Sequence, residues 1–154
     1  MTDEIDAVDP GRPVTASQAA GLTLAAARRI IAAVQDEARA MGVPLSAAVI
    51  DAGDQLVAFE RMDAADLVSI TLARDKAYSA LMNRMPTGEL AAYAQPGAEF
   101  FGYESLSGGR MIVFAGGLPL ERGGILVGAL GVSGGSAEQD ARAADAGARA
   151  FAPG

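Results

Sequence analysis

The order of hydrophobic and polar positions divides the first half of the chain into a helix and two strands. Over residues 22–41, apolar side chains recur every three to four positions, which predicts an amphipathic helix capped by Thr23. Short apolar runs over 45–50 and 55–61 flank the turn sequence Asp51-Ala52-Gly53-Asp54. This pattern predicts a β-hairpin directly after the helix.

The second half of the chain is predicted to add more helices and more strands. Further helices are expected at 67–85, 87–93 and 137–151, and further strands at 110–114, 118–122 and 125–133. The last helix begins with Ser136-Ala137-Glu138-Gln139, the pattern of a capping box. Strands joined by tight turns and covered by helices predict an α+β fold with one antiparallel sheet of about five strands.

The first 21 residues differ from the rest of the chain. They contain the breaker cluster Asp9-Pro10-Gly11-Arg12-Pro13 and show no hydrophobic period. We therefore predict a flexible N-terminal tail or arm over 1–21 and a single domain over 22–154.

Composition excludes several classes of chemistry and partner. The 154 residues include no Cys and no His, which excludes disulfides, thiolate or imidazole zinc sites, Ser-His-Asp triads and histidine-ligated haem. A net charge of -7 disfavours nucleic acid and anionic membranes as partners. The N-terminus is acidic, unlike a signal peptide, and no apolar run approaches the roughly 18 residues of a membrane span. We expect a cytoplasmic protein.

Five phrases, in this order along the chain, resemble the GlcG/HbpS family. They are Val49–Leu56, Glu60–Asp63, Ala73–Tyr78, Gly116–Pro119 and Gly128–Asp140. The resemblance implies a profilin-like or PAS-like sandwich that assembles into homo-oligomers, with an octamer as a candidate size. It also implies a small-molecule ligand, since some family members bind or degrade haem, although others have no established activity.

The sequence departs from the family pattern at positions that matter for haem. Haem-binding relatives offer a histidine to the iron, and this chain has none. Alanine also replaces two residues that are usual in the family, a proline at Ala115 and a glycine at Ala64. We therefore expect no cofactor, and only weak haem binding through Met or Tyr ligands. No acidic pair has the spacing of a metal site.

Arg61, Met62 and Asp63 lie where a predicted strand ends and the link to the next helix begins, a place where side chains can point into a cleft. A guanidinium there can hold a carboxylate through two hydrogen bonds. The alternative is an internal salt bridge of Arg61 with Asp63 or Glu60.

Lys76 is the only lysine of the chain, and small residues surround it on the predicted helix. A desolvated amine can act as a base, as a Schiff-base nucleophile or as an anion ligand, with Tyr78 assisting. The alternative is an ion pair on a solvated face, with Asp75 or another acidic residue.

The glycine turns and the aromatic residues are also open to two interpretations. Gly116, Gly117, Leu118 and Pro119 could line a pocket, or could serve as a turn that needs positive φ. Glu138 and Asp140 suit the dipole of the last helix, although either is also a candidate pocket residue. The aromatic residues Phe100, Phe101 and Tyr103 could close over a flat ligand, or fill the core or an oligomer interface.

These residues together predict a protein that binds a small anionic or carbonyl-bearing metabolite. The candidate pocket consists of Arg61, Met62, Asp63, Lys76, Tyr78, Gly116, Gly117, Leu118, Pro119 and Glu138. One alternative is a lyase, isomerase or hydrolase in which Lys76 or Asp63 transfers protons and Tyr78 assists. A further alternative is haem binding or degradation without a histidine ligand.

Overall fold

The computed structural model describes residue 11 and residues 13–152, and its centre is one antiparallel sheet. The strands are β1 (Ser46–Asp51), β2 (Leu56–Arg61), β3 (Gly117–Arg122) and β4 (Ile125–Ser133). Their order across the sheet is β2-β1-β4-β3. The predicted α+β class is confirmed, with four strands where about five were expected.

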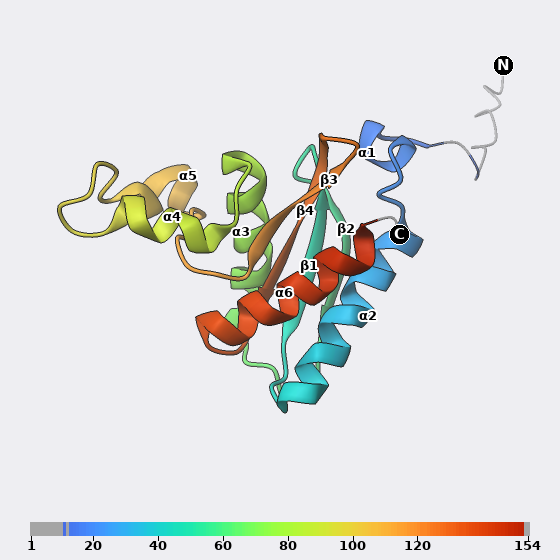
Figure 1. The fold of residues 1–154 in the computed structure, drawn as a ribbon, viewed down its shortest axis with the longest axis horizontal. Helices are drawn as coiled ribbons and strands as arrows, with labels where there is room; N and C mark the ends of the chain where they lie inside the picture. Colours follow the sequence, from blue (N-terminus) through green and yellow to red (C-terminus); the bar gives the residue numbers. More distant parts are fainter. Residues whose placement is uncertain (1–10, 12, 153–154) are drawn as a thin grey trace, which may run out of the picture.

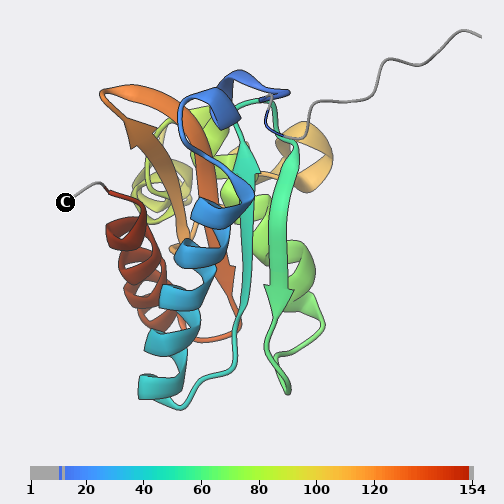
Figure 2. The same cartoon turned by 90° about the vertical axis from the view of Figure 1, so that its right-hand side faces the viewer.

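Helices cover both faces of the sheet. The helices α2 (Leu24–Met41) and α6 (Ala137–Phe151) lie side by side on one face, and α3 (Val68–Asn83) covers the other (Figure 1, Figure 2). Alternation along β1 explains this division, because Val49 packs toward α2 and α6 whereas Ile50 packs toward α3. The predicted caps of α2 and α6 are confirmed, since Thr23 accepts a backbone hydrogen bond and Ser136 forms a capping box with Gln139.

The predicted strand over residues 110–114 is wrong. Its backbone is bonded to a side chain of α3 and not to a neighbouring strand. The Ser79 hydroxyl accepts from the Ile112 amide at 2.8 Å, and it shares its proton between the Asp75 carbonyl at 2.7 Å and the Arg110 carbonyl at 3.0 Å. A serine on a helix thus satisfies backbone groups that a fifth strand would otherwise have paired.

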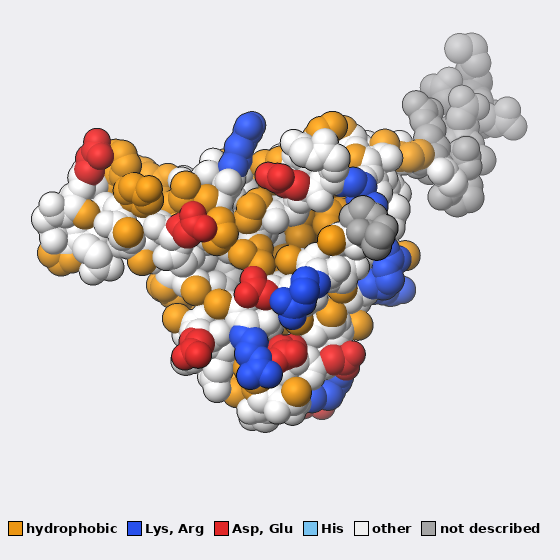
Figure 3. All heavy atoms as spheres, in the orientation of Figure 1, with side chains coloured by type: hydrophobic (Ala, Val, Ile, Leu, Met, Phe, Trp, Pro, Cys, Tyr) orange, Lys and Arg blue, Asp and Glu red, His pale blue; other side chains and the backbone are white. Residues whose placement is uncertain are grey.

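An arm projects beyond α3 in Figure 1. It contains α4 (Thr87–Ala94), the 3-10 helix η1 (Tyr103–Ser105) and α5 (Leu106–Gly109). Figure 3 shows that hydrophobic side chains gather on this arm. Arg110 follows the end of this arm and connects it to the rest of the fold, because its guanidinium pairs with Asp54 at 2.8 Å and with Asp75 at 3.1 Å.

The predicted N-terminal tail lies partly outside the described residues, at 1–10 and 12. Within the described part, α1 (Ala16–Ala19) forms a short helix, and the buried Ser17 hydroxyl accepts a hydrogen bond from the Ala52 amide at 3.0 Å. None of the helices in the described part of the chain has the length and apolarity to cross a membrane.

Candidate functional site

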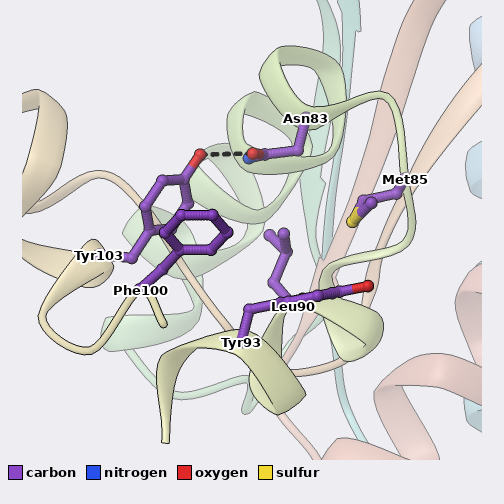
Figure 4. A pocket seen from close by; sticks show the side chains of 6 residues that line it. All are labelled: Asn83, Met85, Leu90, Tyr93, Phe100 and Tyr103. Carbon is purple, nitrogen blue, oxygen red and sulfur yellow. Dashed lines mark hydrogen bonds between the residues drawn. The ribbon is translucent and has the colours of Figure 1, made fainter. Parts of the chain in front are cut away.

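A cavity of about 250 Å³ opens where the arm meets the end of α3. The residues that line this aromatic cavity are Asn83, Met85, Leu90, Tyr93, Phe100 and Tyr103 (Figure 4). Three of the six side chains are aromatic rings, two are apolar chains and one is an amide. None of these described lining residues carries a charge, so the cavity favours an apolar and flat molecule.

The three rings are held together by the path of the chain after α4. Pro96 and Gly97 break the helix, and Gly97 adopts a φ of 85°, which turns the chain back toward α4. The Phe100 amide then donates to the Tyr93 carbonyl at 3.0 Å. As a result the Phe100 ring lies between two tyrosines, with its centroid 6.2 Å from the Tyr93 ring and 6.2 Å from the Tyr103 ring.

Two hydroxyl groups supply polar atoms at opposite sides of the aromatic cavity (Figure 4). The Tyr103 hydroxyl donates to Asn83 Oδ1 at 2.5 Å, so toward a ligand it can only accept. Asn83 is itself held by α3, because its Nδ2 donates to the Ser79 carbonyl at 2.8 Å. The Tyr93 hydroxyl makes no hydrogen bond within the described part of the chain, which leaves it free to donate. A carbonyl group of a ligand could accept from the Tyr93 hydroxyl, and a hydroxyl group could donate to the Tyr103 hydroxyl.

The sequence predicts that Lys76 lines a ligand pocket, whereas in the structure its amine forms a buried ion pair. Its side chain is 0% exposed, and Nζ donates to Asp140 Oδ2 at 2.6 Å and to the Val132 carbonyl at 3.0 Å. The Phe114 ring centroid lies 5.0 Å from the same nitrogen. Burial lowers the pKa of Lys76 and raises the pKa of Asp140, while the attraction between the two groups opposes both shifts.

The structure does not bring all of the predicted pocket residues together. Arg61, Met62 and Asp63 line a separate, open cavity of about 350 Å³ with Gln35 and Arg39. This cavity lies beside β2, whereas Gly116 precedes β3 and residues 117–119 belong to β3, at the opposite edge of the sheet. Three strand spacings, about 14 Å, separate these two edges.

Tyr78 also points away from Lys76, because residues two positions apart on a helix do not share a face. Its hydroxyl donates to Ser107 Oγ at 3.0 Å, and its ring lies 3.7 Å from the Arg110 guanidinium carbon. Glu138 is exposed in the first turn of α6, and Pro119 is half-buried in β3. Of the predicted residues, Gly116 lies close to Lys76, since a Cβ added there would stand 2.8 Å from Nζ.

Sequence reasoning missed the partner of Lys76 and most of the aromatic cavity. Asp140 was assigned to the helix dipole, although an acidic residue in a phrase shared with the family was a signal for a specific contact. Met85 and Leu90 offered no signal, because apolar residues near helix ends usually serve the core. Within the described residues, no group of three acidic side chains is arranged to hold a metal ion.

Comparisons with known proteins give several relatives at the level of sequence. The chain is 40% identical over 123 residues to an uncharacterised 15.0 kDa protein from the dhaT-dhaS intergenic region of Citrobacter freundii, covering 80% of this chain and 87% of that protein. It is 43% identical over 108 residues to the corrinoid adenosyltransferase PduO of Salmonella typhimurium, covering 70% of this chain. That match spans only 32% of PduO, about a third of its length.

Comparison with solved structures also finds similar proteins. Klebsiella pneumoniae protein ORFY matches with a TM-score of 0.83 and 36% identity, covering 84% of this chain and 90% of that one. The PduOC:heme complex matches with a TM-score of 0.81 and 38% identity, covering 84% and 94%. The sequence also matches the family described as haem degrading protein HbpS-like over residues 22–149. The chain therefore belongs to the HbpS-like family.

Proposed function

We propose that this protein binds a small, flat, carbonyl-bearing molecule in the aromatic cavity. The lining carries the proposal: three rings surround an uncharged space, and the Tyr93 hydroxyl is free to donate to a carbonyl oxygen. The volume of about 250 Å³ suits a small ligand, because sites for drug-sized molecules are usually larger, at roughly 300 to 1,000 Å³. The ligand class agrees with one of the two that the sequence predicts.

The neutral fluorophore prodan, a naphthalene with a ketone, is a suitable probe. We expect its emission to shift to shorter wavelength on binding, and the Phe100→Ala variant to bind it about tenfold more weakly, because a ring that lies tilted between two tyrosines is lost. Phe101→Ala is the matched control, since this neighbouring ring is 65% exposed and does not line the cavity. Equal affinities of the two variants would contradict the proposal.

An anionic metabolite, the other predicted ligand, would suit a different place. Arg61 and Arg39 both line the open cavity beside β2, where a carboxylate could meet two guanidinium groups. Asp63 lies in the same lining and would repel such a ligand. The proposed roles of Arg61 as an anion ligand and of Asp63 as a base remain predictions of the sequence.

Haem is the second candidate ligand, and the complex of the related PduOC with heme favours it. The donors at the aromatic cavity are the Met85 thioether and the Tyr93 and Tyr103 hydroxyls, all of which can ligate iron. The macrocycle exceeds the cavity in size and would have to extend over its open side. One of these donors would ligate the iron of a bound porphyrin, and the aromatic rings would contact the macrocycle.

A haemin titration tests this second candidate. If Met85 ligates the iron, the Soret band should change at a stoichiometry of one haemin per chain, and Met85→Ala should remove that change. Met82→Ala serves as the control, because this neighbouring methionine is exposed on α3 and lies outside the cavity lining. A non-saturating signal, equal in both variants, would rule out the candidate.

We also infer that the protein assembles with copies of itself, as the family resemblance implies, with an octamer as the candidate size. Apolar residues on α3 leave one side of the helix uncovered, since Val68 is 58% exposed and the preceding Leu67 is 74% exposed. A second copy could bury this apolar surface. Light scattering at micromolar concentration should give a mass well above one chain, and a monomer would contradict the inference.

A further inference from the structure

Lys76 lies near the wall of a second cavity, because its amine is close to Gly116, which lines that cavity. This cavity, which we call the Gly116 cavity, has a volume of about 210 Å³. The residues that line it are Pro86, Gly88, Glu89, Ala115, Gly116, Gly117, Leu118, Ala141 and Asp145. Its wall toward Lys76 has no side chain, because a Cβ on Gly116 would stand 2.8 Å from Nζ.

The chemistry of the lining limits what could enter the Gly116 cavity. Apolar groups such as Pro86 and Leu118 form most of the wall. The two ionisable side chains, Glu89 and Asp145, are exposed and acidic, so they would repel an anion at the entrance. A space of about 210 Å³ corresponds to roughly seven water molecules, at about 30 Å³ each. The cavity suits a small uncharged molecule.

The Phe114 ring contacts both the Lys76 amine and solvent. Phe114 lies over the amine at 5.0 Å and is itself 42% exposed. Residues 111–116, which carry this ring, belong to no helix or strand. Because Phe114 contacts the amine and precedes the cavity residues Ala115 and Gly116, we infer that a rotation of its side chain would expose the amine beside Gly116 without unfolding an element.

We propose that Lys76 is a carbonyl-reactive amine that forms an imine with a small uncharged aldehyde or ketone bound in the Gly116 cavity. Asp140 is the proton acceptor, because its Oδ2 lies 2.6 Å from Nζ. The proposal concerns a different site from the aromatic cavity and does not depend on the ligand there.

The reaction balances with the groups that are present. Transfer of one proton from Nζ to Asp140 leaves a neutral amine, whose lone pair attacks the carbonyl carbon as the carbonyl π bond breaks. Asp140 then returns this proton to the carbinolamine oxygen, and the oxygen leaves as water with two of the three original amine protons. The product is a protonated imine that faces an ionised Asp140, so the charge of the pair is unchanged.

The electrostatics of the pair assist this first proton transfer. Burial lowers the pKa of Lys76 and raises the pKa of Asp140, and both shifts favour the neutral amine with the neutral acid. An exposed lysine at pH 7 lacks this advantage, because almost every amine holds its proton.

Reductive trapping tests the proposal on the full chain. The protein is incubated with butanal and cyanoborohydride at pH 7, so that any imine is reduced to a stable butyl amine. Because Lys76 is the only lysine, mass spectrometry of its peptide reports this one side chain. The α-amino group serves as the internal reference. We expect Lys76 to be modified in the folded protein.

Two variants and a second aldehyde make the result decisive. Phe114→Ala should raise the rate of Lys76 modification about tenfold relative to the α-amino group, as loss of a strong cation–π contact would allow. Phe101→Ala, an exposed ring elsewhere on the chain, should leave the rate unchanged. The anionic aldehyde glyoxylate should modify Lys76 more slowly than butanal does. The proposal is overturned if Lys76 stays unmodified in Phe114→Ala or reacts only in urea, and a preference for glyoxylate overturns the uncharged class.

Discussion

Replacing Lys76 with methionine should cost about 3–5 kcal/mol of folding free energy at pH 7, because it leaves the Asp140 carboxylate buried without its cation. Methionine fills a similar space, so packing changes little. Asp140 keeps its hydrogen bond from the Gly135 amide at 2.9 Å, which does not replace a full charge. Urea unfolding of variant and wild type measures the difference.

This cost should shrink as the pH falls. Burial already raises the pKa of Asp140, and removing Lys76 takes away the attraction that lowers it. A carboxyl whose pKa is raised in the folded state destabilises the fold increasingly above its unfolded pKa, and in full above the raised pKa. The penalty disappears below its ordinary value of 3.8, where the unfolded chain also holds the proton. The loss measured at pH 7 should therefore exceed the loss measured near pH 4.

Two further variants separate the ion pair from other effects. The double variant Lys76→Met/Asp140→Leu should recover most of the stability, because an apolar pair often replaces a buried ion pair without loss. Arg142→Met, on the same helix as Asp140, breaks an exposed pair with Glu37 and should cost at most about 1 kcal/mol. If the Lys76→Met variant were as stable as Arg142→Met, the buried ion pair would contribute no more to stability than an exposed pair does.

The elements that the sequence predicted well are those with a strong local signal. Over α2, every third or fourth residue is apolar, and Thr23 and Gly42 mark its two ends. The hairpin of β1 and β2 follows from the turn residues 51–54 between two apolar runs. The predicted strand at 110–114 failed because the competing partner, Ser79, is a side chain more than thirty residues away, and periodicity does not report such contacts.

The candidate site was predictable only in part. Lys76 was identified because it is the only lysine of the chain, and its burial is consistent with a specific role. Its partner, however, lies 64 residues away, at the start of α6. The aromatic residues were recognised as either a ligand cover or a packing cluster. Their cavity also depends on Asn83, a polar residue that no motif marks. Both the Lys76–Asp140 pair and the aromatic cavity were hard to predict mainly because the residues involved lie far apart in the sequence, and less because their local patterns are weak.

Replacing Gly131 with alanine should be the most damaging substitution on the sheet face beneath α3. A Cβ at this position would stand 1.8 Å from the Ala73 carbonyl oxygen and 2.6 Å from the Ala77 amide nitrogen. Both atoms belong to the backbone of α3, so no side chain can rotate away and the whole helix must shift. Overpacking usually costs about 1–3 kcal/mol, and a clash with backbone on this scale should reach or exceed the upper value.

The shift of α3 would also reach the buried ion pair, because Lys76 lies on the helix turn between Ala73 and Ala77. The Gly131→Ala variant should therefore be less stable than wild type, and its Lys76 should be modified by aldehyde to a greater extent. Gly124→Ala is the control, since its Cβ would meet nothing within 4 Å and only its φ of 76° opposes alanine, at a cost of about 1–2 kcal/mol. Urea unfolding of the two variants compares these costs. Equal stabilities would mean that α3 does not rest on the backbone of β4 as closely as these distances require.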